Sequence, residues 1–517
     1  MAGEQDKLIM ENHLINIKIL FVTFIMLVVF GVSSSIFLFK KTDFFTARQM
    51  VQTINYLNYK LAFAQTDNES LAAVGINDRA KSVPVLLYHG IIDRPDGSNI
   101  LLKDFEEQMF GLKKAGWQTV SIEDFREFMK GGKELPAKSF LLTFDDGRKD
   151  SYYPVDPILR ALDYRAVMFV DTQHSINLGG NGYYLSPKEL TKMLESGHWE
   201  IQSHSRKAHS FYPIDKKGNV GTFLGNKFWL QDEERLETDE EFEARIRADL
   251  QGSKSDIRNT FGVDIFSFAY PFGDFGRDSI NFPDAERVVL AAAQSFYEMS
   301  FYQSWTRRTF TSNYPDSSFL IKRIGVRPYW NSNNLLKVLS IAEDKNLPYQ
   351  DDFTSFNGWN ESYGKISIEN GSMILYSNPK IGSSVFLDGS YLWEDYIFSS
   401  GVQLTKKQTF SLFARFKDTS NYVACVFTLD SVRAEQMMDG KRVLRAEKKV
   451  KLLSIGENFE VGIGVRSNTV DCYVSNSIAI KTKIEKLPKN GGVGFELWDL
   501  EKEEGSLVVN SVTIEQL

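Results

Sequence analysis

The chain has 517 residues but only two cysteines, Cys425 and Cys472, both in runs that predict strands near the C-terminus. Two cysteines do not make the disulfide framework that holds small secreted domains together. They also lack the spacing of a metal-binding motif, so they carry no cofactor assignment. They could pair across neighbouring strands in an exported protein, but we expect two buried thiols.

The sequence also lacks long blocks of like charge, internal repeats and low-complexity tracts. Its formal net charge of −7 argues against general nucleic-acid binding, which needs a basic surface. We therefore expect no nucleic-acid partner. A composition of 43% hydrophobic and 25% charged residues is typical of globular proteins, and the length allows two to four domains.

One long uncharged run, residues 19–39, is apolar enough to predict a membrane-spanning helix. Its length is close to the roughly 20 residues that cross a bilayer, and it exceeds the core of a signal peptide. We therefore expect residues 1–41 to form a cytoplasmic tail and an uncleaved transmembrane anchor. The flanking basic residues are Lys7 and Lys18 before the run and Lys40, Lys41 and Arg48 after it. Taken alone, these basic residues favour a cytoplasmic location for the residues that follow the run. The catalytic assignment below leads us to expect the opposite orientation, with the bulk of the chain outside the cytoplasm.

The rest of the chain changes pattern twice. Residues 42–80 carry few core signals and predict a tether. In residues 81–346 apolar strand-like runs alternate with helix-like runs, which predicts an α/β domain shaped as a distorted (β/α) barrel. Residues 347–517 show period-two alternation between turn residues, which predicts an all-β sandwich and a candidate glycan-binding module.

Two adjacent carboxylates, Asp145 and Asp146, end a buried strand in the stretch LLTFDDG. A second predicted strand ends in IQSHSRKAHS, which supplies His204 and His209. Two imidazoles and a carboxylate suit a divalent metal and leave positions open for water and substrate. A five-residue spacing requires a loop between the histidines, and two unrelated surface histidines are the alternative.

In this order, TFDDG, the histidine pair and AYPFG resemble the polysaccharide deacetylases of carbohydrate esterase family four, over about residues 81–345. PVLLYHGI and the histidine spacing resemble the branch that acts on poly-β-1,6-N-acetylglucosamine. The resemblance implies that Asp146, His204 and His209 hold a divalent metal, with Zn²⁺ the first choice and Co²⁺ or Ni²⁺ also acceptable. It also implies that Asp145 is the general base, which takes a proton from the attacking water.

The sequence departs from this family at two places. Many members carry an arginine two residues before the proline of the YPFG element, where this chain has Ala269. Arg323 is our candidate substitute for orienting the base. Many members also have a late histidine as general acid, but the last histidine here is His209. We therefore propose His89, at the end of the first strand, as the acid. The alternative is that His89 is a structural residue.

The AYPFG element is expected to line the substrate pocket through Tyr270, Phe272 and Gly273, with the Tyr270 N–H offered to the oxyanion. The alternative is that the element is only a strand followed by a turn.

Together these expectations describe a membrane-anchored, metal-dependent N-deacetylase of an N-acetylhexosamine exopolysaccharide in the cell envelope. Its expected partners are the polysaccharide, the membrane and export or synthesis machinery. One alternative is peptidoglycan deacetylation by the same site. Another is a glycan-binding protein that has lost activity, which Ala269 and the missing late histidine would favour.

Overall fold

The structure is a computed structural model that describes residues 44–66, 78–303, 309–316, 318–355, 357–378, 381–450, 454–498 and 504–517. The run at residues 19–39, predicted as the membrane anchor, lies outside these ranges. In the part of the chain that is described, no helix is long and apolar enough to span a bilayer.

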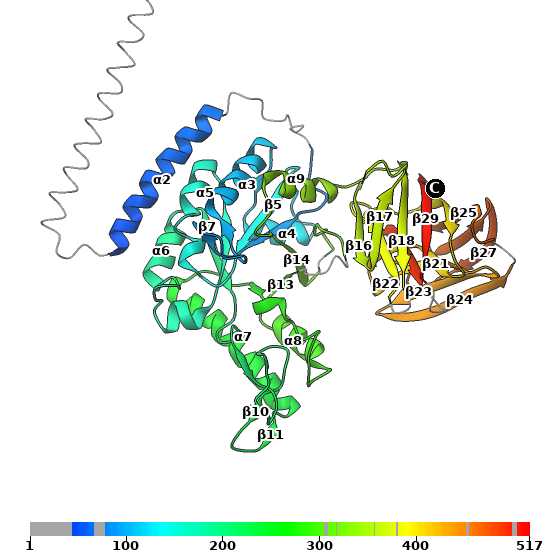
Figure 1. Ribbon diagram of the computed structural model, residues 1–517. Helices are drawn as coiled ribbons and strands as arrows, with labels where there is room; N and C mark the ends of the chain where they lie inside the picture. Colours follow the sequence, from blue (N-terminus) through cyan, green and yellow to red (C-terminus); the bar gives the residue numbers. More distant parts are fainter. Residues whose placement is uncertain are drawn as a thin grey trace, which may run out of the picture.

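Seven parallel strands close into a barrel in the first half of the chain (Figure 1). The ring closes because β1 pairs with β14 on one side and with β5 on the other. Strands β5 and β6 are buried along their whole length, as expected for a barrel covered by helices. In ring order they are β1 (Val85–Tyr88), β14 (Leu320–Gly325), β13 (Met299–Gln303), β12 (Ser267–Ala269), β7 (Trp199–Ser203), β6 (Ala166–Val170) and β5 (Ser139–Phe144). The predicted distorted barrel is confirmed.

Helices surround the barrel and connect its strands. They are α3 (Leu102–Lys114), α4 (Ile122–Met129), α5 (Asp156–Leu162), α6 (Pro187–Glu195), α7 (Asp239–Phe261), α8 (Ala285–Gln294) and α9 (Ser332–Ile341). Ser186 and Thr238 cap α6 and α7 in reciprocal capping boxes, which fix the starts of these helices. Short strands lie in the connections: β2 (Ile91–Ile92), β3 (Ile100–Leu101), β4 (Gln118–Thr119), β8 (Phe211–Pro213), β9 (Val220–Thr222), β10 (Trp229–Leu230) and β11 (Arg235–Leu236). Single turns η1 (Lys149–Ser151), η2 (Gln173–Asn177) and η3 (Pro271–Gly273) complete them.

Part of the segment predicted as a tether is a helix that packs on the barrel domain. Helix α2 (Phe44–Thr66) lies along the outside of α5 (Figure 1). Its Tyr59 and Phe63 rings contact Phe110 of α3, and the Tyr59 hydroxyl donates to Glu106. The few apolar residues of this stretch are therefore used against the domain rather than left in a free linker.

Two antiparallel sheets form the second half of the chain and enclose a single hydrophobic core. One sheet contains β17 (Lys365–Glu369), β18 (Ser372–Ser377), β29 (Gly505–Gln516), β20 (Tyr396–Leu404), β25 (Asn458–Arg466), β26 (Thr469–Val474) and β27 (Ser477–Lys483), with β15 (Tyr349–Asp351) beside β29. The other contains β16 (Trp359–Tyr363), β19 (Ser383–Leu387), β28 (Gly492–Trp498), β21 (Thr409–Asp418), β22 (Asn421–Phe427), β23 (Ser431–Met438) and β24 (Lys441–Lys449). Aromatic contacts such as Phe398 against Phe495 join the sheets, as expected for a sandwich.

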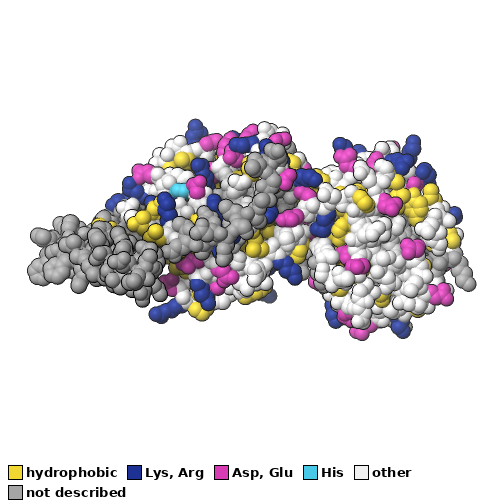
Figure 2. Space-filling view, turned by 90° about the horizontal axis from the view of Figure 1, so that it is seen from above, with side chains coloured by type: hydrophobic (Ala, Val, Ile, Leu, Met, Phe, Trp, Pro, Cys, Tyr) yellow, Lys and Arg dark blue, Asp and Glu magenta, His cyan; other side chains and the backbone are white. Residues whose placement is uncertain are grey.

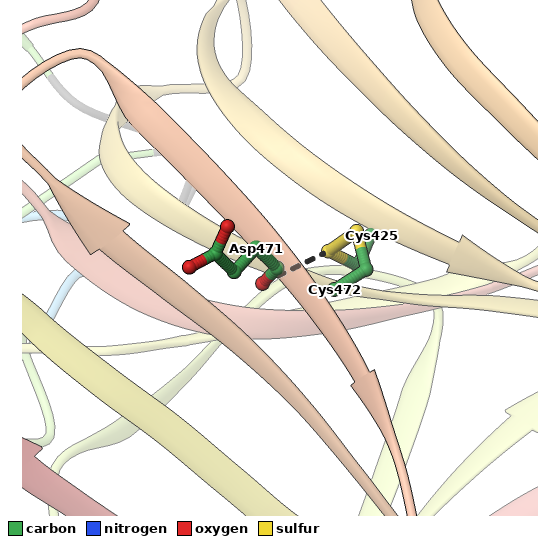
Figure 3. The surroundings of a disulfide bond; sticks show 3 residues. All are labelled: Cys425, Asp471 and Cys472. Atoms are coloured by element: carbon green, nitrogen blue, oxygen red, sulfur yellow. Dashed lines mark hydrogen bonds between the residues drawn. A yellow bond between two sulfur atoms is a disulfide. The ribbon is translucent and has the colours of Figure 1, made fainter. Parts of the chain in front are cut away.

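A disulfide between Cys425 and Cys472 joins these two sheets (Figure 3). The expectation of two buried thiols was therefore wrong. The cysteines lie on β22 and β26, which belong to opposite sheets, so the pair crosses the core rather than linking neighbouring strands. The sequence could not show this pairing, because the way two sheets pack against each other depends on residues that are far apart in the chain.

The connection between β13 and β14 packs against the sandwich. Phe310 contacts Phe386, and the Tyr314 ring stacks on Tyr391 with centroids 4.1 Å apart. The backbone N–H of Thr311 donates to the buried carboxylate of Asp388 at 3.1 Å.

Acidic and basic side chains are interspersed over the face seen in Figure 2, with no large field of one sign.

Candidate metal and catalytic site

The candidate functional residues converge at the carboxyl ends of the barrel strands. His89 follows β1, Asp145 and Asp146 follow β5, and His204 follows β7. This is the edge at which active sites of parallel α/β barrels are built, because the loops after all the strands meet there. Residues far apart in sequence are thus brought together by topology alone.

Asp146, His204 and His209 form a cluster suited to one metal ion. One ligand atom from each lies within 4.8 Å of the others. The Asp146 Oδ1 atom is 3.3 Å from His204 Nε2 and 3.0 Å from His209 Nε2. That Oδ1 atom is buried and makes no hydrogen bond, so it offers a free lone pair to a cation. Two imidazoles and a carboxylate are a common ligand set for zinc, so the residues fit the predicted metal.

The backbone around these residues explains why the side chains converge. Asp146 adopts a left-handed φ of 74°, and Ser205, directly after His204, has a φ of 73°. Such conformations are unfavourable for non-glycine residues and persist only where surrounding contacts enforce them. The imidazole Nδ1 of His204 lies 2.9 Å from the Ala269 carbonyl oxygen. Donation to that carbonyl leaves Nε2 as the ligand atom, an arrangement typical of metal-binding histidines.

Asp145 is held by Arg323, a strand residue of β14. The two guanidinium nitrogens lie 2.6 and 2.8 Å from the two carboxylate oxygens, and both side chains are fully buried. Burial raises the pKa of Asp145, but the charge of Arg323, with His204, outweighs it and leaves the pKa below its usual value. Asp145 is therefore ionised, oriented and adjacent to the metal cluster without belonging to it. Arg323 therefore contacts both carboxylate oxygens of Asp145, as expected of a residue that orients this side chain.

His89 is partly buried beside the same charges. The Ser151 hydroxyl donates to its carbonyl oxygen at 2.9 Å, which ties the end of β1 to the loop after β5. Burial lowers the pKa of His89, whereas the carboxylates of Asp145 and Asp146 act in the opposite direction. The net pKa lies below its ordinary value.

The three residues expected to line the pocket have different surroundings in the structure. The Tyr270 side chain is fully buried, and its N–H donates to the Phe301 carbonyl at 2.9 Å. The prediction that this N–H binds an oxyanion is therefore wrong, because the N–H already donates to a backbone carbonyl of the neighbouring strand. The Gly273 N–H also bonds within the turn, to the Tyr270 carbonyl. Phe272 is 36% exposed, has a φ of 60°, and places its ring 4.7 Å from the His209 ring.

Two further features were missed from sequence. Phe211, 57% exposed, contacts Phe272 with the ring centroids 5.0 Å apart and extends the aromatic surface that begins at His209. Asp171, directly after β6, accepts from His174 at 2.8 Å. The position of Asp171 at a strand end was a usable signal, whereas Phe211 gives none beyond its closeness to His209 in sequence.

Comparison with known proteins agrees with this geometry. Residues 132–284 match the family model described as polysaccharide deacetylase. The poly-beta-1,6-N-acetyl-D-glucosamine N-deacetylase of Escherichia coli K12 is 31% identical over 179 residues, which are 32% of this chain and 27% of that protein. The protein of the same name from Staphylococcus epidermidis is 25% identical over 182 residues, 34% of this chain and 55% of that protein.

A solved structure of a de-N-acetylase from Aggregatibacter actinomycetemcomitans matches 50% of this chain and 100% of its own, with 22% identity and a TM-score of 0.43. The chain spans only about a quarter to a half of the length of the two curated relatives above. The range matched by the family model, residues 132–284, contains Asp145, Asp146, His204 and His209. This chain therefore carries a polysaccharide deacetylase domain.

Proposed function

We propose that this chain removes N-acetyl groups from a polysaccharide of the poly-β-1,6-N-acetylglucosamine type, with a divalent metal, Zn²⁺ as the first choice. The observation that carries the proposal is the pairing of two adjacent carboxylates with different partners. Asp146 faces two imidazoles, and Asp145 faces a buried arginine.

The residues that would hold the ion are Asp146, His204 and His209. When bound, such an ion supplies Lewis-acid chemistry, which makes an amide carbonyl more electrophilic and a water more acidic. The Asp145 carboxylate, kept ionised by Arg323, accepts a proton from the attacking water. The amide nitrogen must gain a proton before it can leave, and His89 donates it when its imidazole is in the protonated, imidazolium form.

The substrate assignment is supported by the names of the relatives at modest identity. Two different observations support the proposed cellular location. A disulfide is typical of proteins in oxidising compartments, and residues 19–39 have the composition of a membrane anchor. The bulk of the chain, in this proposal, lies on the outer side of the cytoplasmic membrane. A fusion reporter placed after Leu517 that works only outside the cytoplasm should be active, and a silent reporter would contradict this orientation.

Acetate release tests the activity directly. Purified protein should release acetate from β-1,6-linked N-acetylglucosamine oligomers, should lose this activity after chelation, and should regain it with Zn²⁺, Co²⁺ or Ni²⁺. Peptidoglycan and β-1,4-linked N-acetylglucosamine oligomers serve as competing substrates. Faster turnover of either would move the assignment to that polymer, and no release from any of them would leave a glycan-binding role.

A further inference from the structure

A groove of about 710 Å³ lies between helix α2 and the loops at the carboxyl edge of the barrel. Its volume is within the range of ligand pockets, roughly 300–1,000 Å³. The mechanism above uses none of the residues that line it.

The inner wall of the groove continues directly from the candidate catalytic residues. Ile91 and Ile92 follow His89 after one residue, and Lys149 and Asp150 lie in the turn that follows Asp146. The Lys149 N–H donates to the Tyr183 carbonyl at 2.8 Å, which fixes Tyr183 beside that turn. The Arg148 guanidinium lies 4.8 Å from the centre of the Tyr183 ring and also holds this side chain beside the turn.

The outer wall is one stripe of α2. Ala47, Val51 and Asn55 recur every fourth residue, so they share one helix face. The stripe is held in place, because the Arg48 guanidinium lies 4.6 Å from the centre of the Tyr153 ring and Tyr59 bonds to Glu106. The groove therefore has two fixed walls.

The chemistry of the walls suits a sugar chain. Tyr183 is 44% exposed and offers an aromatic face with a polar end, and Val51 and Ile92 add apolar surface. Asn55 and Asp150 add hydrogen-bonding groups between these surfaces. Sugar rings present apolar faces and hydroxyl edges, and pockets that combine apolar walls with a few polar groups recognise such ligands.

We propose that this groove binds the hexosamine residues that flank the sugar being deacetylated, with α2 as a wall of the substrate-binding cleft. The inference rests on the proposed function, because it assumes that the polymer reaches the metal cluster. It assigns α2 a role in recognising chain length, which a simple tether would not have.

The test compares two tryptophan variants on the same helix in the full-length protein. Val51→Trp fills the groove from its outer wall, whereas Leu57→Trp changes a residue of similar exposure, 52% against 56%, that does not line it. Acetate release is measured on β-1,6-linked N-acetylglucosamine oligomers of increasing length. For Val51→Trp we expect kcat/KM on long oligomers to fall roughly three- to tenfold, the size of one lost contact, with a loss that grows with length. Leu57→Trp should match the wild type at every length.

Asn55→Trp, which fills the same groove, replaces Val51→Trp if thermal melting shows that the first variant is unfolded. Equal behaviour of the groove and control variants would overturn the inference, as would a wild-type kcat/KM that does not rise with oligomer length. If the wild type releases no acetate at all, the proposed function fails. Calorimetry with the longest oligomer then tests the groove separately, because binding should still be weakened by Val51→Trp and not by Leu57→Trp.

Discussion

The barrel and the sandwich each bury an arginine almost completely, Arg323 at 0% and Arg415 at 1% exposed. In the barrel, Arg323 holds an equally buried carboxylate, Asp145, whose neighbour Asp146 has an oxygen without a hydrogen bond. In the sandwich, Arg415 donates to the half-exposed Asp395 and to the Pro488 carbonyl, and so ties loops together. A buried charge therefore indicates chemistry only where unused ligand atoms lie beside it.

Buried carboxylates also differ between the barrel and the sandwich. Burial raises the pKa of Glu496, on β28 of the sandwich, to about 7, and its carboxylate accepts from Tyr363. The sandwich itself contains no histidine, because the last histidine of the sequence is His209. A perturbed pKa alone would have pointed to both halves of the molecule, whereas convergence with histidines selects the barrel.

The largest expected effect separates the two halves through metal content. Asp146→Ala removes the carboxylate shared by both imidazoles, so we expect bound metal to be lost and acetate release to fall about 10³-fold or more. Asp395→Ala, which removes the acid partner of the sandwich arginine, should leave metal content at the wild-type level. Elemental analysis of the purified proteins checks both. Retention of metal by Asp146→Ala would mean that the cluster is not the metal site.

The next effect distinguishes the two adjacent carboxylates within the barrel. Asp145→Asn keeps the shape of the side chain but removes its capacity to accept a proton. We expect metal to be retained and turnover to fall by roughly 10²- to 10⁴-fold, the usual contribution of a general base. The measurement pairs elemental analysis with the initial rate of acetate release. A near-normal rate with full metal content would assign the base to another residue.

A smaller and more selective effect is expected at His89. His89→Ala should slow the hydrolysis of the acetamide by about 10²-fold, because the leaving nitrogen then lacks its proton donor. An activated acetate ester should be affected much less, since its leaving group departs without a proton. The ratio of the two rates is the readout. Equal losses on amide and ester would indicate a structural role for His89, and no loss on either would exclude it as the acid.

The barrel fold and the candidate metal cluster could be predicted from sequence because both depend on local signals. Apolar strand-like runs that end in polar residues, such as LLTFDDG, located the candidate catalytic edge. Because parallel strands deliver their carboxyl ends to one edge, Asp146 and the histidines could be grouped without any knowledge of distances.

The errors arose where distant backbone decides the outcome. The Tyr270 N–H looked available until the pairing of β12 with β13 gave it the Phe301 carbonyl as acceptor. Helix α2 has too weak an apolar face to be recognised as part of the domain, and its contacts to Phe110 depend on where α3 lies. No sequence pattern indicates which sheet a strand joins. The expectation of two free thiols at Cys425 and Cys472 was wrong for the same reason.

Removal of the Cys425–Cys472 disulfide is expected to have the smallest effect on activity and the largest effect on local stability. The disulfide joins residues 47 apart in sequence and holds the two sheets together from inside the core. Closing a loop of this length in the unfolded chain is worth about 2–4 kcal/mol, so Cys425→Ser should lower the stability of the sandwich by that amount. Because the change lies in the sandwich core rather than at the barrel edge, acetate release from short oligomers should stay at the wild-type level.

Hydrogen exchange followed by mass spectrometry separates the two halves in one experiment. Peptides from β22 and β26 should lose protection in Cys425→Ser, whereas peptides from β5 and β7 should not. Wild-type protein under reducing conditions is the matched control and should reproduce the pattern. Equal loss of protection in the barrel strands would mean that the Phe310 and Tyr314 contacts make the two halves one cooperative unit. The contrast between a catalytic barrel and a structurally separate sandwich would then hold for chemistry but not for stability.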